Sequence, residues 1–116
     1  MNSLRLLSNE QLIDEYALLA KRVGEAIVNW MPEAKLRQQL YAPENEIKAR
    51  GCRMNLAKLL NNDNRFVRYY AAQELYGPLP QLCRPIIEEN TREFDAIAGD
   101  ARGFLRAIDE GAYKPA

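Results

Sequence analysis

The stretch that decides the fold is residues 54–78, MNLAKLLNNDNRFVRYYAAQELYGP. Its short apolar segment, 54–60, leads into Asn61–Asn64, four residues that favour turns and can cap a helix. The following segment repeats its apolar residues every three or four positions, which is the spacing of one helix face, and Gly77-Pro78 ends it. The stretch therefore predicts two helices joined by a tight turn.

The same helical spacing is present towards the N-terminus. Ser8 with Gln11 makes a capping box, in which each side chain bonds the backbone of the other, so a helix is expected to start there. This helix should end near Trp30, because Pro32 disfavours helical geometry at the residue before it. Trp30 falls on the apolar face and is therefore predicted to lie in the core. The face consists of Leu12, Tyr16, Leu19, Val23, Ala26 and Trp30.

A second helix is expected to run from Pro32 to Arg50, where Gly51 supplies the stop. Pro43 lies inside this segment. Because proline removes one backbone hydrogen bond and crowds the preceding turn, we expect a kink or a break into two pieces.

The C-terminal third predicts two more helices. One starts at Pro80, and Pro85 either kinks it or moves its true start to near Arg84. Asp100 is the expected cap of the last helix, and Gly111 is its expected end.

Residues 112–116 are expected to form an extended tail. Tyr113 either docks back against the last helix or belongs to a recognition surface.

The whole chain of 116 residues is expected to form one domain, residues 1–116, because it is too short for two. No stretch alternates with period two for long enough to make a strand. We therefore predict an all-α fold of about five or six antiparallel helices with short connections.

Composition excludes several classes of enzyme. The chain has no histidine, so zincins, Ser-His-Asp hydrolases and Cys-His proteases are excluded. It also has no phosphate-binding glycine loop and no nucleophile elbow. Cys52 and Cys83 lack the paired spacing of a metal or redox site, and both are expected to be buried reduced thiols. We expect no catalysis, no metal and no cofactor.

Two further exclusions concern location and charge. No uncharged run approaches the roughly 20 residues of a membrane span, so we expect no membrane partner and a soluble, cytoplasmic protein. Sixteen basic residues balance sixteen acidic ones, so no overall field draws the chain onto nucleic acid.

The deciding stretch resembles a HEAT-like helical repeat. The resemblance is carried by the apolar helix and turn described above, together with Val67-Arg68, Ala71-Ala72 and Leu75-Tyr76-Gly77. It implies paired helices around a tight turn, small alanines that let helices approach, and an arginine bonded within the turn region. Asp63 and Arg68 match these polar positions.

The C-terminal part is similar to the ending of a bacterial family known as domain of unknown function 2019. The similar residues are Ala98-Gly99-Asp100-Ala101, Leu105, Asp109-Glu110-Gly111 and Lys114-Pro115. This resemblance implies a HEAT or armadillo-like α-α superhelix, and it implies no activity.

The leading functional hypothesis is a noncatalytic module that binds a protein partner through the surface of a helical stack. Its role would be regulatory or antitoxin-like. If the repeat resemblance holds, second helices of successive hairpins line the concave side. This reasoning selects Arg53 and Lys58 on the third helix, and Arg84 and Glu88 on the fifth, as candidate partner-binding residues.

The alternative hypothesis is nucleic-acid binding by the basic segment 50–70, in which aromatic residues are interleaved. The neutral net charge disfavours it, and these side chains can equally belong to the repeat turn, the core and a solvated surface. The basic residues are Arg50, Arg53, Lys58, Arg65 and Arg68.

An acidic stretch, 88–100, can meet a basic partner or the basic segment of another copy, which leaves head-to-tail self-association open. It can equally be a solvated helix end.

Overall fold

The computed structural model describes residues 3–116, and all regular structure in that range is helical. The predicted all-α class is thereby confirmed for these residues. The α-helices are α1 Asn9–Val28, α2 Ala34–Arg50, α3 Arg65–Leu75, α4 Pro80–Thr91 and α5 Ala96–Asp109, and the 3₁₀ segments are η1 Ser3–Leu6 and η2 Arg53–Asn61.

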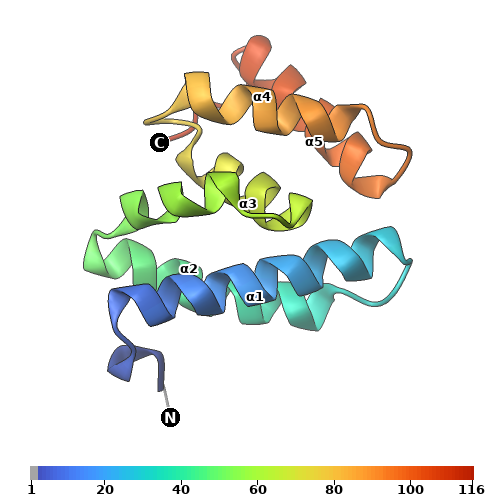
Figure 1. Cartoon of the computed structure of the whole chain (residues 1–116). Helices are drawn as coiled ribbons and strands as arrows, with labels where there is room; N and C mark the ends of the chain where they lie inside the picture. Colours follow the sequence, from blue (N-terminus) through green and yellow to red (C-terminus); the bar gives the residue numbers. More distant parts are fainter. Residues whose placement is uncertain (1–2) are drawn as a thin grey trace.

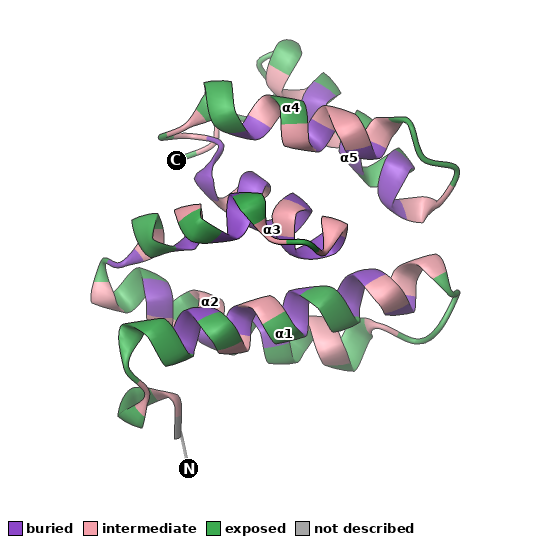
Figure 2. Cartoon of the chain, in the orientation of Figure 1, coloured by how far each residue is buried: buried purple, intermediate pink, exposed green. Residues whose placement is uncertain are grey.

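The helices are arranged as three stacked pairs (Figure 1). Consecutive elements pack together as α1 with α2, η2 with α3, and α4 with α5. Helix α3 lies in the middle, where it contacts α1 on one side and α4 on the other. Buried residues occur in each of the three layers, so one core runs through the stack (Figure 2).

Helix α1 begins as predicted. The Gln11 backbone N–H donates to the Ser8 hydroxyl at 3.1 Å, and the Ser8 backbone N–H donates to the Gln11 side chain at 2.9 Å. The apolar face of α1 is buried as far as Ala26. Gly24 lies where a Cβ atom would be 2.2 Å from the Phe66 ring, so this glycine lets α1 approach α3 closely.

The prediction for Trp30 is wrong, because this side chain is 86% exposed. Helix α1 ends at Val28, and Trp30 takes a left-handed backbone conformation with φ 57°. The Trp30 N–H donates to the Ile27 carbonyl, and the Met31 N–H donates to the Ala26 carbonyl. This pair of bonds is a Schellman motif, and it turns the tryptophan away from the apolar face.

Neither internal proline divides its helix. Helix α2 continues through Pro43, which is buried, and ends at Gly51 with φ 67° as predicted. Helix α4 starts at Pro80, in the first turn where a missing N–H costs nothing, and continues through Pro85. Of the alternatives that the sequence left open, the break of α2 and the later start of α4 near Arg84 are therefore wrong, and the start of α4 at Pro80 is confirmed.

The connection into α3 follows the prediction, although the expected short helix is a 3₁₀ segment, η2. The Asn64 side chain caps α3 by accepting from the backbone N–H groups of Phe66 and Val67. Arg68 bonds within the turn, because its Nη1 donates to the carbonyls of Asn62 and Asp63.

Helix α5 starts earlier than predicted. Asp95, and not Asp100, is the cap, since its carboxylate accepts from the Ala98 backbone N–H at 3.0 Å. The earlier start adds Ile97 and Ala98 to the buried face of the helix. Asp100 consequently lies inside α5, where it accepts a hydrogen bond from the Tyr69 hydroxyl.

Candidate functional site

The four candidate partner-binding residues lie on the first helix of a pair, Arg53 and Lys58 on η2 and Arg84 and Glu88 on α4, and not on the second helices as expected. Arg84 and Glu88 belong to one cluster of charged side chains. Arg84 donates to both carboxylate oxygens of Asp109 at 2.8 Å and lies 3.5 Å from Glu88. Arg53 donates to the Ala116 carbonyl at 2.9 Å, and the Lys58 ammonium is 3.9 Å from Asp14 on α1. Arg84 and Glu88 border a shallow hollow of about 350 Å³ on α4, whereas Arg53 borders a different cleft.

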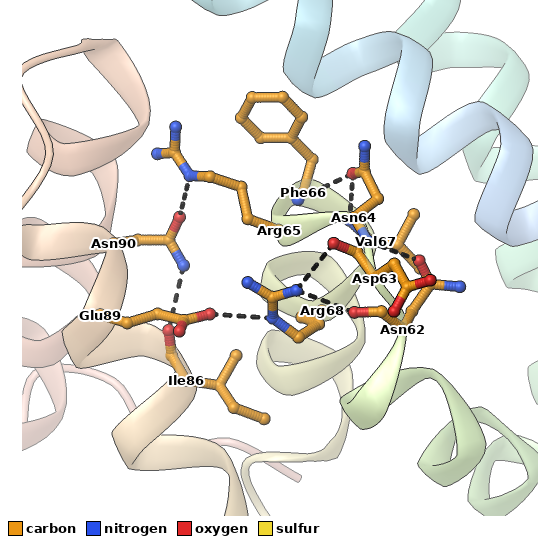
Figure 3. A network of polar contacts seen from close by, with 10 residues as sticks. All are labelled: Asn62, Asp63, Asn64, Arg65, Phe66, Val67, Arg68, Ile86, Glu89 and Asn90. Carbon is orange, nitrogen blue, oxygen red and sulfur yellow. Dashed lines mark hydrogen bonds and ion pairs between the residues drawn. The ribbon is translucent and has the colours of Figure 1, made fainter.

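The basic segment 50–70 bonds to other parts of the same molecule (Figure 3). Arg65 pairs with Asp95 at 2.8 Å, and its Nε donates to Asn90 at 2.9 Å. Arg68 pairs with Glu89 at 3.0 Å. Part of the acidic stretch 88–100 is thus joined to the basic segment within one chain.

Arg50 has a comparable role at the opposite end of the stack. It pairs with Glu46 at 2.9 Å and donates to the carbonyls of Leu4 and Leu7, both at 2.8 Å, which fastens η1 to the end of α2.

A cleft of about 780 Å³ opens along the second members of the three pairs, α2, α3 and α5. Glu44 and Lys48 line it from α2, Glu74 from α3 and Phe104 from α5. Arg53 and residues of the C-terminal segment 113–116 line the remaining edge. Helices α2, α3 and α5 therefore each contribute polar or aromatic side chains to the lining of this one cleft.

Two carboxyl groups meet in this cleft. A hydrogen bond joins Glu74 and Glu44, and burial, this bond and the negative charge of Glu44 together raise the pKa of Glu74 to about 7. The Lys48 ammonium lies 3.3 Å from Glu44 and partly offsets the repulsion. Beneath the pair, Tyr16 of α1 is fully buried, and its pKa is raised by burial and by the two nearby carboxylates.

A second polar group extends from Gln73, which lines the cleft, to α5. The Gln73 amide donates to the Tyr69 hydroxyl at 2.8 Å and to Asp100 at 3.3 Å. Burial and the bond to Asp100 raise the pKa of Tyr69, so this phenol remains a neutral donor. The network joins α3 to α5 with polar groups that are mutually satisfied.

Within residues 3–116, no cluster of three or more metal-ligating side chains is present. Both thiols are buried and unpaired as predicted, and burial raises the pKa of Cys83 to about 11. No helix in this range has the length and the apolar character needed to cross a membrane.

A comparison of the chain with protein-family models, with curated proteins and with solved structures gives no match.

The carboxyl pair was not predicted from the sequence. Glu44 and Glu74 are 30 positions apart on different helices, so no local spacing connects them. The one available signal was Glu74 itself, because it recurs with the apolar residues of its helix where a solvated carboxylate is not expected.

Proposed function

We propose that this protein is a noncatalytic module that binds a segment of a protein partner in the cleft between α2, α3 and α5. The observation that carries the proposal is that a segment of the chain itself already lies along one edge of this cleft. Residues 113–116 meet the cleft through an aromatic ring, a backbone carbonyl and a close approach to a glycine. These are the contacts by which surfaces bind extended peptides.

We further propose that the three pairs form a HEAT or armadillo-like superhelix related to the domain of unknown function 2019 family. Two features support this. Arg68 bonds within the turn before its own helix, and Ala71 and Ala72 are fully buried where α3 contacts its neighbours. In such a stack the second helices line the concave side, which agrees with a cleft along α2, α3 and α5. A regulatory or antitoxin-like role in the bacterial cytoplasm is part of the same proposal.

The arrangement of the basic segment favours a protein partner over nucleic acid. Arg50, Arg65 and Arg68 each have an acidic partner within the chain. Contact with phosphate would require these pairs to separate, and that requirement would reduce the affinity gained from neutralising each phosphate.

Affinity capture from a native cell extract, with and without nuclease, tests the proposal. Wild type is compared with Glu74→Lys, which places a positive charge in the cleft, and with Glu93→Lys, the same substitution at an exposed loop position. Glu74→Gln provides a version without an added charge, and circular dichroism establishes that each variant folds.

We expect that one specific protein is recovered and that nuclease treatment does not reduce its recovery. The Glu93→Lys variant should still capture it, and the Glu74→Lys variant should not. Retention by both charge variants would refute the cleft as the binding surface. If recovery of the captured molecules is instead lost on nuclease treatment and with the double variant Arg53→Glu/Lys58→Glu, the protein binds nucleic acid.

A further inference from the structure

The last residues of the chain return to the body of the protein. Helix α5 ends at Asp109, and Gly111, with a φ of 73°, turns the backbone back towards α3 and α4 (Figure 1). The Tyr113 ring then packs edge-on against Phe104, with ring centroids 5.8 Å apart. Phe104 packs in the same manner on Tyr76 at 5.5 Å, so the tyrosine completes a short row of aromatic rings.

The end of this segment has two more contacts. The Arg53 Nη2 donates to the Ala116 carbonyl at 2.9 Å. Gly77, in the connection between α3 and α4, lies so close that a Cβ atom there would be 2.3 Å from the Ala116 carbonyl carbon. Only glycine at this position permits the backbone of the tail to lie where it does.

The attachment is shallow. Tyr113 remains 46% exposed, residues 112, 114 and 116 are also exposed, and Pro115 is half-buried. Apart from the Tyr113 backbone N–H, which donates to the Ala107 carbonyl of α5 at 3.1 Å, the segment makes three contacts: one ring edge, one side-chain hydrogen bond and one close backbone approach. A competing segment that makes the same three contacts can therefore displace the tail.

We propose that residues 113–116 are an intramolecular substitute for the partner, and that the cleft accepts an extended protein segment with an aromatic residue two positions before a proline. This inference rests on the proposed function and specifies the chemistry of the partner. The aromatic residue packs on Phe104, a backbone carbonyl after the proline accepts from Arg53, and a small residue passes Gly77.

The test uses the full chain, isotope-labelled for amide NMR, and a synthetic peptide with the sequence GAYKPA of residues 111–116, titrated to millimolar concentration. Tyr113→Ala removes the ring that holds the chain's own tail and leaves the lining residues on α2, α3 and α5 unchanged. Since an edge-on ring pair contributes about 0.5–1.5 kcal/mol, we expect this variant to bind the peptide about fivefold more tightly than wild type.

Two glycine variants supply the matched control. Gly77→Ala places a methyl group in the path of both tail and peptide, so peptide binding should be lost. Gly99→Ala makes the same change on α5, where a Cβ atom would meet nothing within 4 Å, and should bind as wild type does. A peptide with alanine in place of its tyrosine should bind about fivefold more weakly than the parent peptide.

The inference is overturned if Tyr113→Ala shows no binding up to millimolar peptide, if it binds no more tightly than wild type, or if Gly77→Ala and Gly99→Ala bind alike. If any of these results is obtained and the affinity capture still yields a protein that is lost with Glu74→Lys, the inferred partner sequence is refuted and the proposed function is retained. Capture that is independent of Glu74 would refute the proposed function itself.

Discussion

Replacing Trp30 with glycine should stabilise the protein, although it removes the largest side chain in the sequence. Three helices end in the same Schellman motif, with a left-handed residue after the C-cap, and φ is 57° at Trp30, 67° at Gly51 and 73° at Gly111. In each case the two closing hydrogen bonds lie between 2.8 and 3.2 Å. Trp30 is thus the one non-glycine residue of the three in a conformation that favours glycine.

The magnitude follows from two opposing contributions. The left-handed conformation costs an L-residue about 1–2 kcal/mol, and glycine avoids that cost. Glycine also makes the unfolded chain more flexible, which removes about 0.4–1 kcal/mol of stability. The tryptophan is 86% exposed, so little burial is lost. We expect a net gain of about 0.5–1 kcal/mol, which for a chain of this length raises Tm by about 2–4 °C.

Thermal and urea unfolding followed by circular dichroism measure this effect. Gly51→Ala is the reverse control: no atom lies within 4 Å of the added Cβ, so it isolates the backbone cost and should lose about 1 kcal/mol. If Gly51→Ala behaves so while Trp30→Gly is neutral or destabilising, the proposed strain at Trp30 is refuted.

Three further predictions concern other parts of the fold. A carboxyl whose folded-state pKa is raised holds its proton more tightly when folded, so Glu74 should make stability fall as pH rises from about 4.5 to about 7. Glu74→Gln should reduce this loss of stability by about 1 kcal/mol, a value lowered because the side chain is partly exposed. Equal midpoints of urea unfolding from pH 5 to 8 in wild type would contradict this prediction. Asp95→Ala removes both the cap of α5 and the partner of Arg65, and should cost about 1–3 kcal/mol in urea unfolding, whereas a loss below 0.5 kcal/mol would show that neither contact matters. Gly24→Ala should cost about 1–3 kcal/mol through its clash with the Phe66 side chain, and a cost that persists unchanged in Phe66→Ala, which lacks the ring, would contradict this cause.

Local signals in the sequence were sufficient where the structure depends on neighbouring residues. The capping box at Ser8, the cap at Asn64 and the stop at Gly51 each involve residues within five positions of one another, so a short pattern specifies them. The same reasoning gave the helical class and the order of the helices.

The predictions failed where distant contacts decide the outcome. Asp95 and Asp100 are both acceptable caps, and the apolar residues Ile97 and Ala98, buried by other helices, select the earlier one. Trp30 is a different case: it follows the apolar spacing, but a local Schellman motif ends α1 before reaching it. The carboxyl pair, formed by α2 and α3, depends on how two helices meet, which their separate sequences do not specify.

The most direct test of the central claim is site-specific photocrosslinking in native extract, because it reports which surface of the protein touches the partner. A photoreactive residue replaces Lys48, which is exposed at the edge of the cleft, or Leu82, which is exposed on α4 outside it. The account predicts that position 48 crosslinks to the captured protein and position 82 does not. Crosslinking from position 82 alone would contradict it and place the interaction outside the cleft.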